Sequence, residues 1–166
     1  LRVGKHKSLN ITNAKTPFKI GKANILKKGR DLTIITCGSM VAESLKAAAQ
    51  LEKKHSIEVI NMHTIKPLDH ETILKSVKKT GAILTVEEHQ KIGGLGSAVA
   101  EFLSQSELNQ SNKPIPFKIL GVDDSFGESG TTQELFKKHK LTSNDIAKEI
   151  KLLIKKVGSK GKYENM

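Results

Sequence analysis

Residues 32–51 read LTIITCGSMVAESLKAAAQL and decide the fold. The first six residues are rich in β-branched side chains and carry no charge, which is typical of a strand covered on both faces. Ser39 then offers a hydroxyl that can accept a hydrogen bond from a free backbone N–H, so we expect it to be the N-cap of a helix. Apolar residues recur at helical spacing at Val41, Leu45, Ala48 and Leu51. A buried strand followed by an amphipathic helix is the repeating unit of α/β folds.

The same unit repeats along the chain. Further strands are predicted at residues 57–62, 82–86 and 117–122. The helices between and after them are marked by Ile73, Leu74 and Val77, by Val99, Phe102 and Leu103, and by Ile146, Ile150, Leu153, Ile154 and Val157. Strands that alternate with helices indicate a parallel sheet with helices on both faces, which is a three-layer α/β/α fold.

Three further predicted helices begin at capping residues. Asp69 is the expected N-cap of the helix that follows residues 66–69. Thr131 with Glu134, and Thr142 with Asp145, have the spacing of a capping box.

The chain has 166 residues, the usual size of one globular domain. Residues 1–16 are polar and aperiodic and are predicted to be a linker or the end of a preceding domain. The domain itself is predicted to span residues 17–157, and residues 158–166 form a polar tail.

The net charge of +11 is compatible with nucleic acid, an acidic partner or phosphorylated substrates. The lysines are scattered in pairs, most of them late in predicted helices, where cations suit the negative end of the helix dipole. This distribution favours solvated helix ends over a nucleic-acid partner. The sequence contains no run of about 18 apolar residues, which is the length needed to span a membrane. Cys37 is the only cysteine, so an intramolecular disulfide is impossible, which fits a reducing cytoplasm.

Ligands of open α/β sheets bind outside the carboxyl ends of the strands. Cys37, at the end of the first strand, could be a thiol activated by a helix N-terminus, but no histidine is near it in sequence. A small residue packed at a strand end is the preferred interpretation.

The second candidate is Glu87-Glu88-His89 with the turn of Gly93, Gly94, Gly96 and Ser97. Such glycines let a backbone approach an anion at a helix N-terminus, so these four residues are a possible anion-binding turn. They supply only part of a dinucleotide fingerprint, and a plain tight turn is favoured. Glu87 and Glu88 could form an acid/base pair, or could simply end a strand in solvent.

The loop of residues 123–130 carries three carboxylates that could hold a hard cation. A turn held by glycines and local side-chain bonds is preferred. The six histidines do not have the spacing of a zinc site, and no metal site is predicted.

Taken in order, five segments resemble the C-terminal domain of transketolases. They are residues 20–23 with 29–35, residues 37–41, residues 64–69 (TIKPLD), residues 87–89 with 93–98, and residues 126–130 (FGESG) with Glu134 and Leu135. The resemblance covers roughly residues 18–157. Deoxyxylulose phosphate synthase and the β subunits of 2-oxo acid dehydrogenases share the domain, but their late loop matches less well. A transketolase of the split, two-subunit type is therefore preferred.

The resemblance implies a mostly parallel five-stranded sheet with one antiparallel edge strand, which we expect residues 18–26 to supply. It also implies a whole enzyme that moves a two-carbon ketol unit between sugar phosphates, using thiamin diphosphate held by Mg²⁺. Thiamin diphosphate and Mg²⁺ would be bound by the diphosphate and pyrimidine domains. This chain is therefore expected to bind no cofactor, to lack catalytic residues and to be inactive alone. Its expected role is assembly, as a homodimer together with the remaining transketolase domains or an N-terminal subunit.

Residues 1–4 resemble the last strand of the pyrimidine domain. An arginine there contacts the substrate phosphate in the family, and a guanidinium suits bidentate phosphate binding. The resemblance therefore makes Arg2 a candidate substrate-phosphate residue. The competing hypotheses are a regulatory module that binds an anion or nucleotide at Gly93–Ser97, and, third, a nucleic-acid binder.

Overall fold

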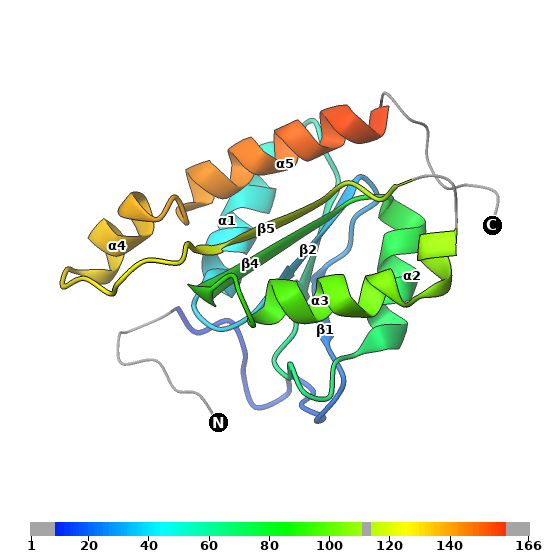
Figure 1. The fold of residues 1–166 in the computed structure, drawn as a ribbon, viewed down its shortest axis with the longest axis horizontal. Coiled ribbons are helices and arrows are strands. Elements are labelled where there is room, and N and C mark those ends of the chain that lie inside the picture. The colour runs from blue at the N-terminus through cyan, green and yellow to red at the C-terminus, as the bar shows by residue number, and fades with distance from the viewer. Residues whose placement is uncertain (1–8, 111–113, 159–166) are drawn as a thin grey trace.

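The computed structural model describes residues 9–110 and 114–158, and it places a five-stranded sheet between two layers of helices (Figure 1). The strands are β1 (Asn24–Lys27), β2 (Leu32–Thr36), β3 (Ile57–Asn61), β4 (Ile83–Gln90) and β5 (Phe117–Val122). The helices are α1 (Met40–Leu51), α2 (His70–Thr80), α3 (Leu95–Ser104), α4 (Thr132–Lys138) and α5 (Ser143–Gly158), with a short 3₁₀ helix at Glu107–Gln110.

The strand order is β1-β3-β2-β4-β5, and every neighbouring pair is parallel except β1 with β3. The sheet is therefore mostly parallel with one antiparallel edge strand, as the sequence predicts. The carboxyl ends of β2, β3, β4 and β5 meet at one edge of the sheet, and the antiparallel β1 begins there, with Asn24 opposite Asn61. We call this border the carboxyl edge.

The edge strand is shorter than predicted. It begins at Asn24, so Phe18 and Ile20 lie outside it. Gly21 has a φ of +76°, and the N–H of Lys22 donates to the carbonyl of Lys19, which makes a turn in front of the strand. The turn removes residues 18–20 from the line of β1.

Each face of the sheet carries its own apolar core. On one face, Leu32, Ile34 and Leu84 pack with α1 and α5; on the other, Ile35 and Ile60 pack with α2 and α3. Such two-sided burial explains why the central strand β2 is buried at every position. In the described part of the chain, no helix has both the length and the apolar character that crossing a membrane requires.

The helix starts test the capping predictions. The carboxylate of Asp69 accepts from the N–H of Thr72, and Thr131 with Glu134 forms a reciprocal capping box. Thr142 and Asp145 exchange the same pair of bonds at the start of α5. Ser39 is the N-cap residue of α1, as predicted, but its side chain makes no capping hydrogen bond. Its hydroxyl donates instead to the carboxylate of Glu88.

Candidate functional site

The carboxyl edge is where an α/β sheet would hold a ligand. The segments that line it are residues 9–23 before β1, 37–39 after β2, 62–69 after β3, 91–94 after β4 and 123–130 after β5. All the residues singled out from the sequence lie on or beside these segments, except Arg2, which falls outside the described residues. What the edge can do depends on whether its polar groups are available to a ligand.

The glycine turn before α3 already holds an anion, and that anion belongs to the chain. Glu87 is 1% exposed, and its two carboxylate oxygens accept from the N–H of Leu95 at 2.7 Å and of Gly96 at 2.8 Å. A carboxylate at a helix N-terminus satisfies free N–H groups and faces the positive end of the helix dipole. A soluble anion would have to displace Glu87, so binding of an external anion at Gly93, Gly94, Gly96 and Ser97 stays a prediction that the geometry opposes.

Two glycines of this turn are required by close contacts, Gly94 with Glu87 and Gly96 with Ile119. A Cβ at Gly94 would lie 2.0 Å from Oε2 of Glu87, and one at Gly96 would lie 2.4 Å from Cγ2 of Ile119. Ser97 closes the turn, because its hydroxyl accepts from the N–H of Gly93 at 3.0 Å and donates to the carbonyl of Lys91 at 2.7 Å. The glycine-rich motif therefore permits close packing within the domain.

Glu87 and Glu88 do not form an acid/base pair. Successive side chains of a strand point to opposite faces of the sheet. Glu87 therefore lies under α3, whereas Glu88 accepts the hydroxyl hydrogen of Ser39 beside α1. The two carboxylates serve different helix layers.

The carboxylates of residues 123–130 are each engaged within the chain. Asp123 pairs with Lys91 at 2.5 Å, Asp124 accepts from the side-chain amide of Gln90 at 2.7 Å, and Glu128 pairs with Lys138. The hydrogen bond and charge of Lys91 lower the pKa of Asp123 below its ordinary value. In residues 9–110 and 114–158, no three His, Cys, Asp or Glu side chains come together as a metal would require.

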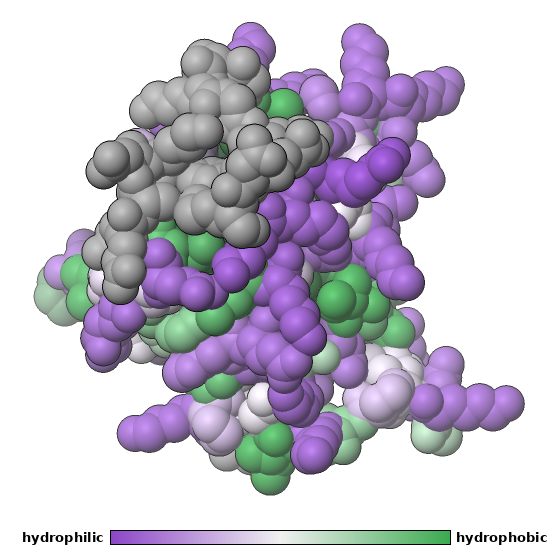
Figure 2. Space-filling model, turned by 90° about the vertical axis from the view of Figure 1, so that its right-hand side faces the viewer, coloured by the Kyte–Doolittle hydropathy of each residue, from purple (hydrophilic) through white to green (hydrophobic). Residues whose placement is uncertain are grey.

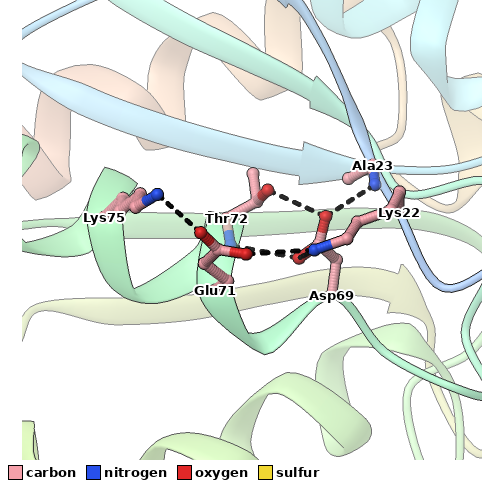
Figure 3. A network of polar contacts seen from close by, with 6 residues as sticks. All are labelled: Lys22, Ala23, Asp69, Glu71, Thr72 and Lys75. Atoms are coloured by element: carbon pink, nitrogen blue, oxygen red, sulfur yellow. Dashed lines mark hydrogen bonds and ion pairs between the residues drawn. The ribbon is translucent and has the colours of Figure 1, made fainter. Parts of the chain in front are cut away.

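Asp69 is engaged by three hydrogen bonds at this edge (Figure 3). It is 3% exposed, and it accepts from the N–H of Ala23 at 2.8 Å as well as from the N–H and hydroxyl of Thr72. Lys22 adds a longer ion pair to Asp69 at 3.9 Å and a hydrogen bond to Glu71 at 3.0 Å. Asp69 thus caps α2 and also fixes the start of β1, a second role that the sequence did not indicate.

The TIKPLD loop and the turn before β1 lock together. A Cβ at Gly21 would lie 3.0 Å from Cγ of Pro67, so the glycine lets the turn approach the proline ring. Phe18 stacks on the imidazole of His63 with 4.7 Å between ring centroids. Two of the segments on which the resemblance rests therefore contact each other, and their residue types are explained by packing.

Cys37 and His70 are also engaged in packing. Cys37 is half-buried at the end of β2 and packs with the apolar core of the α2–α3 face. A shallow hollow between the start of α2 and α3 is lined by Leu68, His70, Ala98, Glu101, Phe102 and Gln105. His70 stacks on Phe102 there, with 3.9 Å between ring centroids, so this histidine also serves packing.

Comparison with known proteins identifies the family to which this fold is similar. The family model "Transketolase, C-terminal domain" matches residues 21–146. The chain is 42% identical over 149 residues to the 6-deoxy-6-sulfo-D-fructose transketolase subunit SqwH of Clostridium sp. (strain MSTE9), which is 89% of this chain and 44% of that subunit. It is 48% identical over 97 residues to a pyruvate dehydrogenase E1 component subunit β of Staphylococcus aureus, covering 58% of this chain and 30% of that subunit.

The fold agrees with a solved relative. A split-gene transketolase, an inactive β4 tetramer, superposes with a TM-score of 0.81 at 40% identity, over 89% of this chain and 47% of that one. The chain spans less than half the length of these relatives. The matched residues include β1 to β5, the glycine turn that encloses Glu87, and the Asp69 network. The chain belongs to the family of transketolase C-terminal domains.

Proposed function

We propose that the chain is the C-terminal part of a thiamin-diphosphate-dependent transketolase and that it contributes assembly, while other domains contribute the chemistry. The whole enzyme would transfer a two-carbon ketol unit between sugar phosphates. The observation that carries the assembly role is the state of the carboxyl edge, whose carboxylates Glu87, Asp69 and Asp123 are all bound to groups of the chain itself.

The engaged polar groups of the carboxyl edge support the proposal that other domains hold the cofactor. A diphosphate needs free N–H groups or cations, but the N–H groups of Leu95 and Gly96 are taken by Glu87. Mg²⁺ needs converging oxygen ligands, and the acids of residues 123–130 are engaged separately by Lys91, Gln90 and Lys138. Both observations support a cofactor held by other domains.

The partners follow from the same proposal. We propose a homodimer that also contacts the remaining transketolase domains or an N-terminal subunit, because the similar solved protein is a tetramer of one subunit type. Arg2 remains the proposed substrate-phosphate residue. We also propose a cytoplasmic location, which the lone Cys37 supports. The match to the pyruvate dehydrogenase β subunit keeps a 2-oxo acid dehydrogenase as the second candidate.

Calorimetry tests the division of labour. The chain is titrated with thiamin diphosphate in the presence of Mg²⁺, and we expect no binding, because its anion-binding turn is occupied and its acids are paired. Inorganic pyrophosphate serves as a control for non-specific attraction to the +11 chain. Tight binding of thiamin diphosphate that requires Mg²⁺ would refute the proposal.

A further inference from the structure

Two carboxylates stay unpaired in the described part of the chain. Among the Asp and Glu residues of 9–110 and 114–158, only Glu101 and Glu149 form neither a hydrogen bond nor an ion pair through the carboxylate. The chain has 28 Lys and Arg against 17 Asp and Glu, so cations are in excess and an unpaired acid is unexpected. Glu149 lies on α5, whereas Glu101 lines the hollow between the start of α2 and α3.

This hollow has the size of a small-molecule site. Its volume is about 440 Å³, and ligand pockets span about 300–1,000 Å³. Figure 2 views the side of the molecule on which α2 and the end of α3 lie, and apolar patches appear there between hydrophilic side chains. Among the six described residues that line the hollow, Glu101 is the one carboxylate, and none is Lys or Arg. The lining therefore carries negative charge in a chain that is basic as a whole.

The apolar wall of the hollow is fixed within the fold. Leu68 and Phe102 both pack against the core of the α2–α3 face. The imidazole of His70 lies parallel to the Phe102 ring, with 3.9 Å between the centroids and 3° between the planes. The backbone N–H of His70 also donates to the carbonyl of Leu68 at 3.1 Å. The stack ties the start of α2 to α3, so a flat aromatic wall is formed before any ligand binds, which lowers the entropic cost of binding.

The polar side chains of the hollow are available to a ligand. His70, Glu101 and Gln105 are exposed, and within the described residues none of them makes a side-chain hydrogen bond. They differ in this respect from Glu87 and Asp123, which the chain itself engages. A carboxylate only accepts hydrogen bonds, whereas an imidazole and an amide can each donate and accept. The set is suited to a ligand that offers several N–H donors.

The lining also indicates the class of ligand. An amidinium or guanidinium group is planar and can donate two parallel N–H bonds to one carboxylate. Such a group is weakly hydrated and stacks on aromatic rings. A flat apolar body attached to it would cover Leu68, Ala98 and Phe102. A phosphate ester, by contrast, would meet the charge of Glu101 and find no cation in the lining.

We propose that this hollow binds a flat organic cation, an aromatic amidine or guanidine, with its charged group on the Glu101 carboxylate and its ring against the His70–Phe102 stack. The site goes beyond the proposed assembly function and does not depend on it. It uses none of the engaged carboxylates of the carboxyl edge, such as Glu87 and Asp123.

A titration of the full chain with benzamidine, followed through the amide chemical shifts by NMR, tests the proposal. The buffer is mildly alkaline, so that imidazoles are uncharged and do not repel the cation. We expect saturable shifts at Ala98, Phe102 and Gln105, with a dissociation constant on the order of 1 mM, because the ligand is small and the hollow is shallow. Benzoate has the same ring and the opposite charge, and it should not bind there.

Substitutions assign the binding to the two recognition elements. Glu101→Gln keeps the shape of an exposed side chain and should raise the dissociation constant at least about threefold, the strength of an exposed ion pair. His70→Ala removes half of the aromatic stack and should also raise it. The matched control is Glu149→Gln, which removes the other unpaired carboxylate and should leave the constant unchanged.

Each of the other outcomes would overturn the proposal. They are a lack of saturable binding, shifts centred on another surface, equal binding of benzoate, an unchanged constant for His70→Ala, and equal effects of Glu101→Gln and Glu149→Gln. Binding of benzamidine requires no Mg²⁺, whereas the proposed function is refuted by Mg²⁺-dependent binding of thiamin diphosphate. The two proposals can therefore fail separately.

Discussion

Replacing Glu87 with alanine is expected to destabilise the domain by about 4 kcal/mol, the upper range for a single substitution. The change removes the acceptor for two buried N–H groups, those of Leu95 and Gly96, and each unsatisfied group costs about 1–3 kcal/mol. It also removes a negative charge from the positive end of the α3 dipole and leaves a cavity beneath the helix. Urea denaturation, followed by circular dichroism, measures the loss.

The neighbouring carboxylate provides the control. Glu88→Ala removes a half-buried group that accepts from the Ser39 hydroxyl, so we expect a loss of about 1 kcal/mol. Glu87→Gln should fall between the two, because the amide keeps one acceptor oxygen. Equal losses for Glu87→Ala and Glu88→Ala would show that Glu87 does not hold the start of α3.

Asp69→Ala is expected to cost roughly 3 kcal/mol, because it leaves the N–H groups of Ala23 and Thr72 without their shared acceptor. The start of β1 should loosen together with the start of α2, since one carboxylate holds both. Amide hydrogen exchange at Ala23 and Thr72 reports the two effects separately. Glu71→Ala, in the same network but on the surface, should change stability little.

The Asp69 contribution should depend on pH in a defined direction. Burial alone would raise the pKa of Asp69, but the hydrogen bonds from Ala23 and Thr72 and the charge of Lys22 outweigh it and lower the pKa. A carboxyl group with a lowered pKa in the folded state stabilises the fold above its unfolded pKa of about 3.9 and loses this effect as the pH falls through the folded value. The stability difference between wild type and Asp69→Ala should therefore shrink on acidification below about pH 4. A difference that is constant with pH would contradict the ionised network.

The parts of the fold that sequence could predict are those set by neighbouring residues. The buried strand at 32–37 and the caps Asp69, Thr131 and Thr142 follow from local patterns, and the structure confirms them. The position of Ser39 as N-cap was predicted correctly, but the partner of its hydroxyl was not, because Glu88 lies 49 positions away and no local pattern encodes a bond between two strands. The beginning of β1 was missed because Gly21 permits a turn that period-two reasoning does not register.

The site was harder to predict for a related reason. A glycine turn at a helix N-terminus indicates an anion, but the sequence does not say whether that anion is a ligand or a side chain. Here Glu87 precedes the turn by six residues, and its carboxylate occupies the position of the anion. The same glycine pattern therefore occurs in a turn that binds a ligand and in a turn that packs around a side chain of the chain itself. The exposure of Phe126 could not be predicted either, because no sequence pattern distinguishes an exposed phenylalanine from one in the core.

Domain exchange tests most directly whether this domain contributes assembly and not chemistry. Residues 21–146 of the chain replace the matched segment of the Clostridium SqwH subunit, with and without Glu87→Ala, and both assembly and the activity of SqwH are measured. The account predicts that the chimera keeps the KM of SqwH for its substrates, and that Glu87→Ala lowers activity only in proportion to the enzyme assembled. A chimera that assembles fully but has lost its activity or changed its KM would place chemistry in this domain and contradict the account.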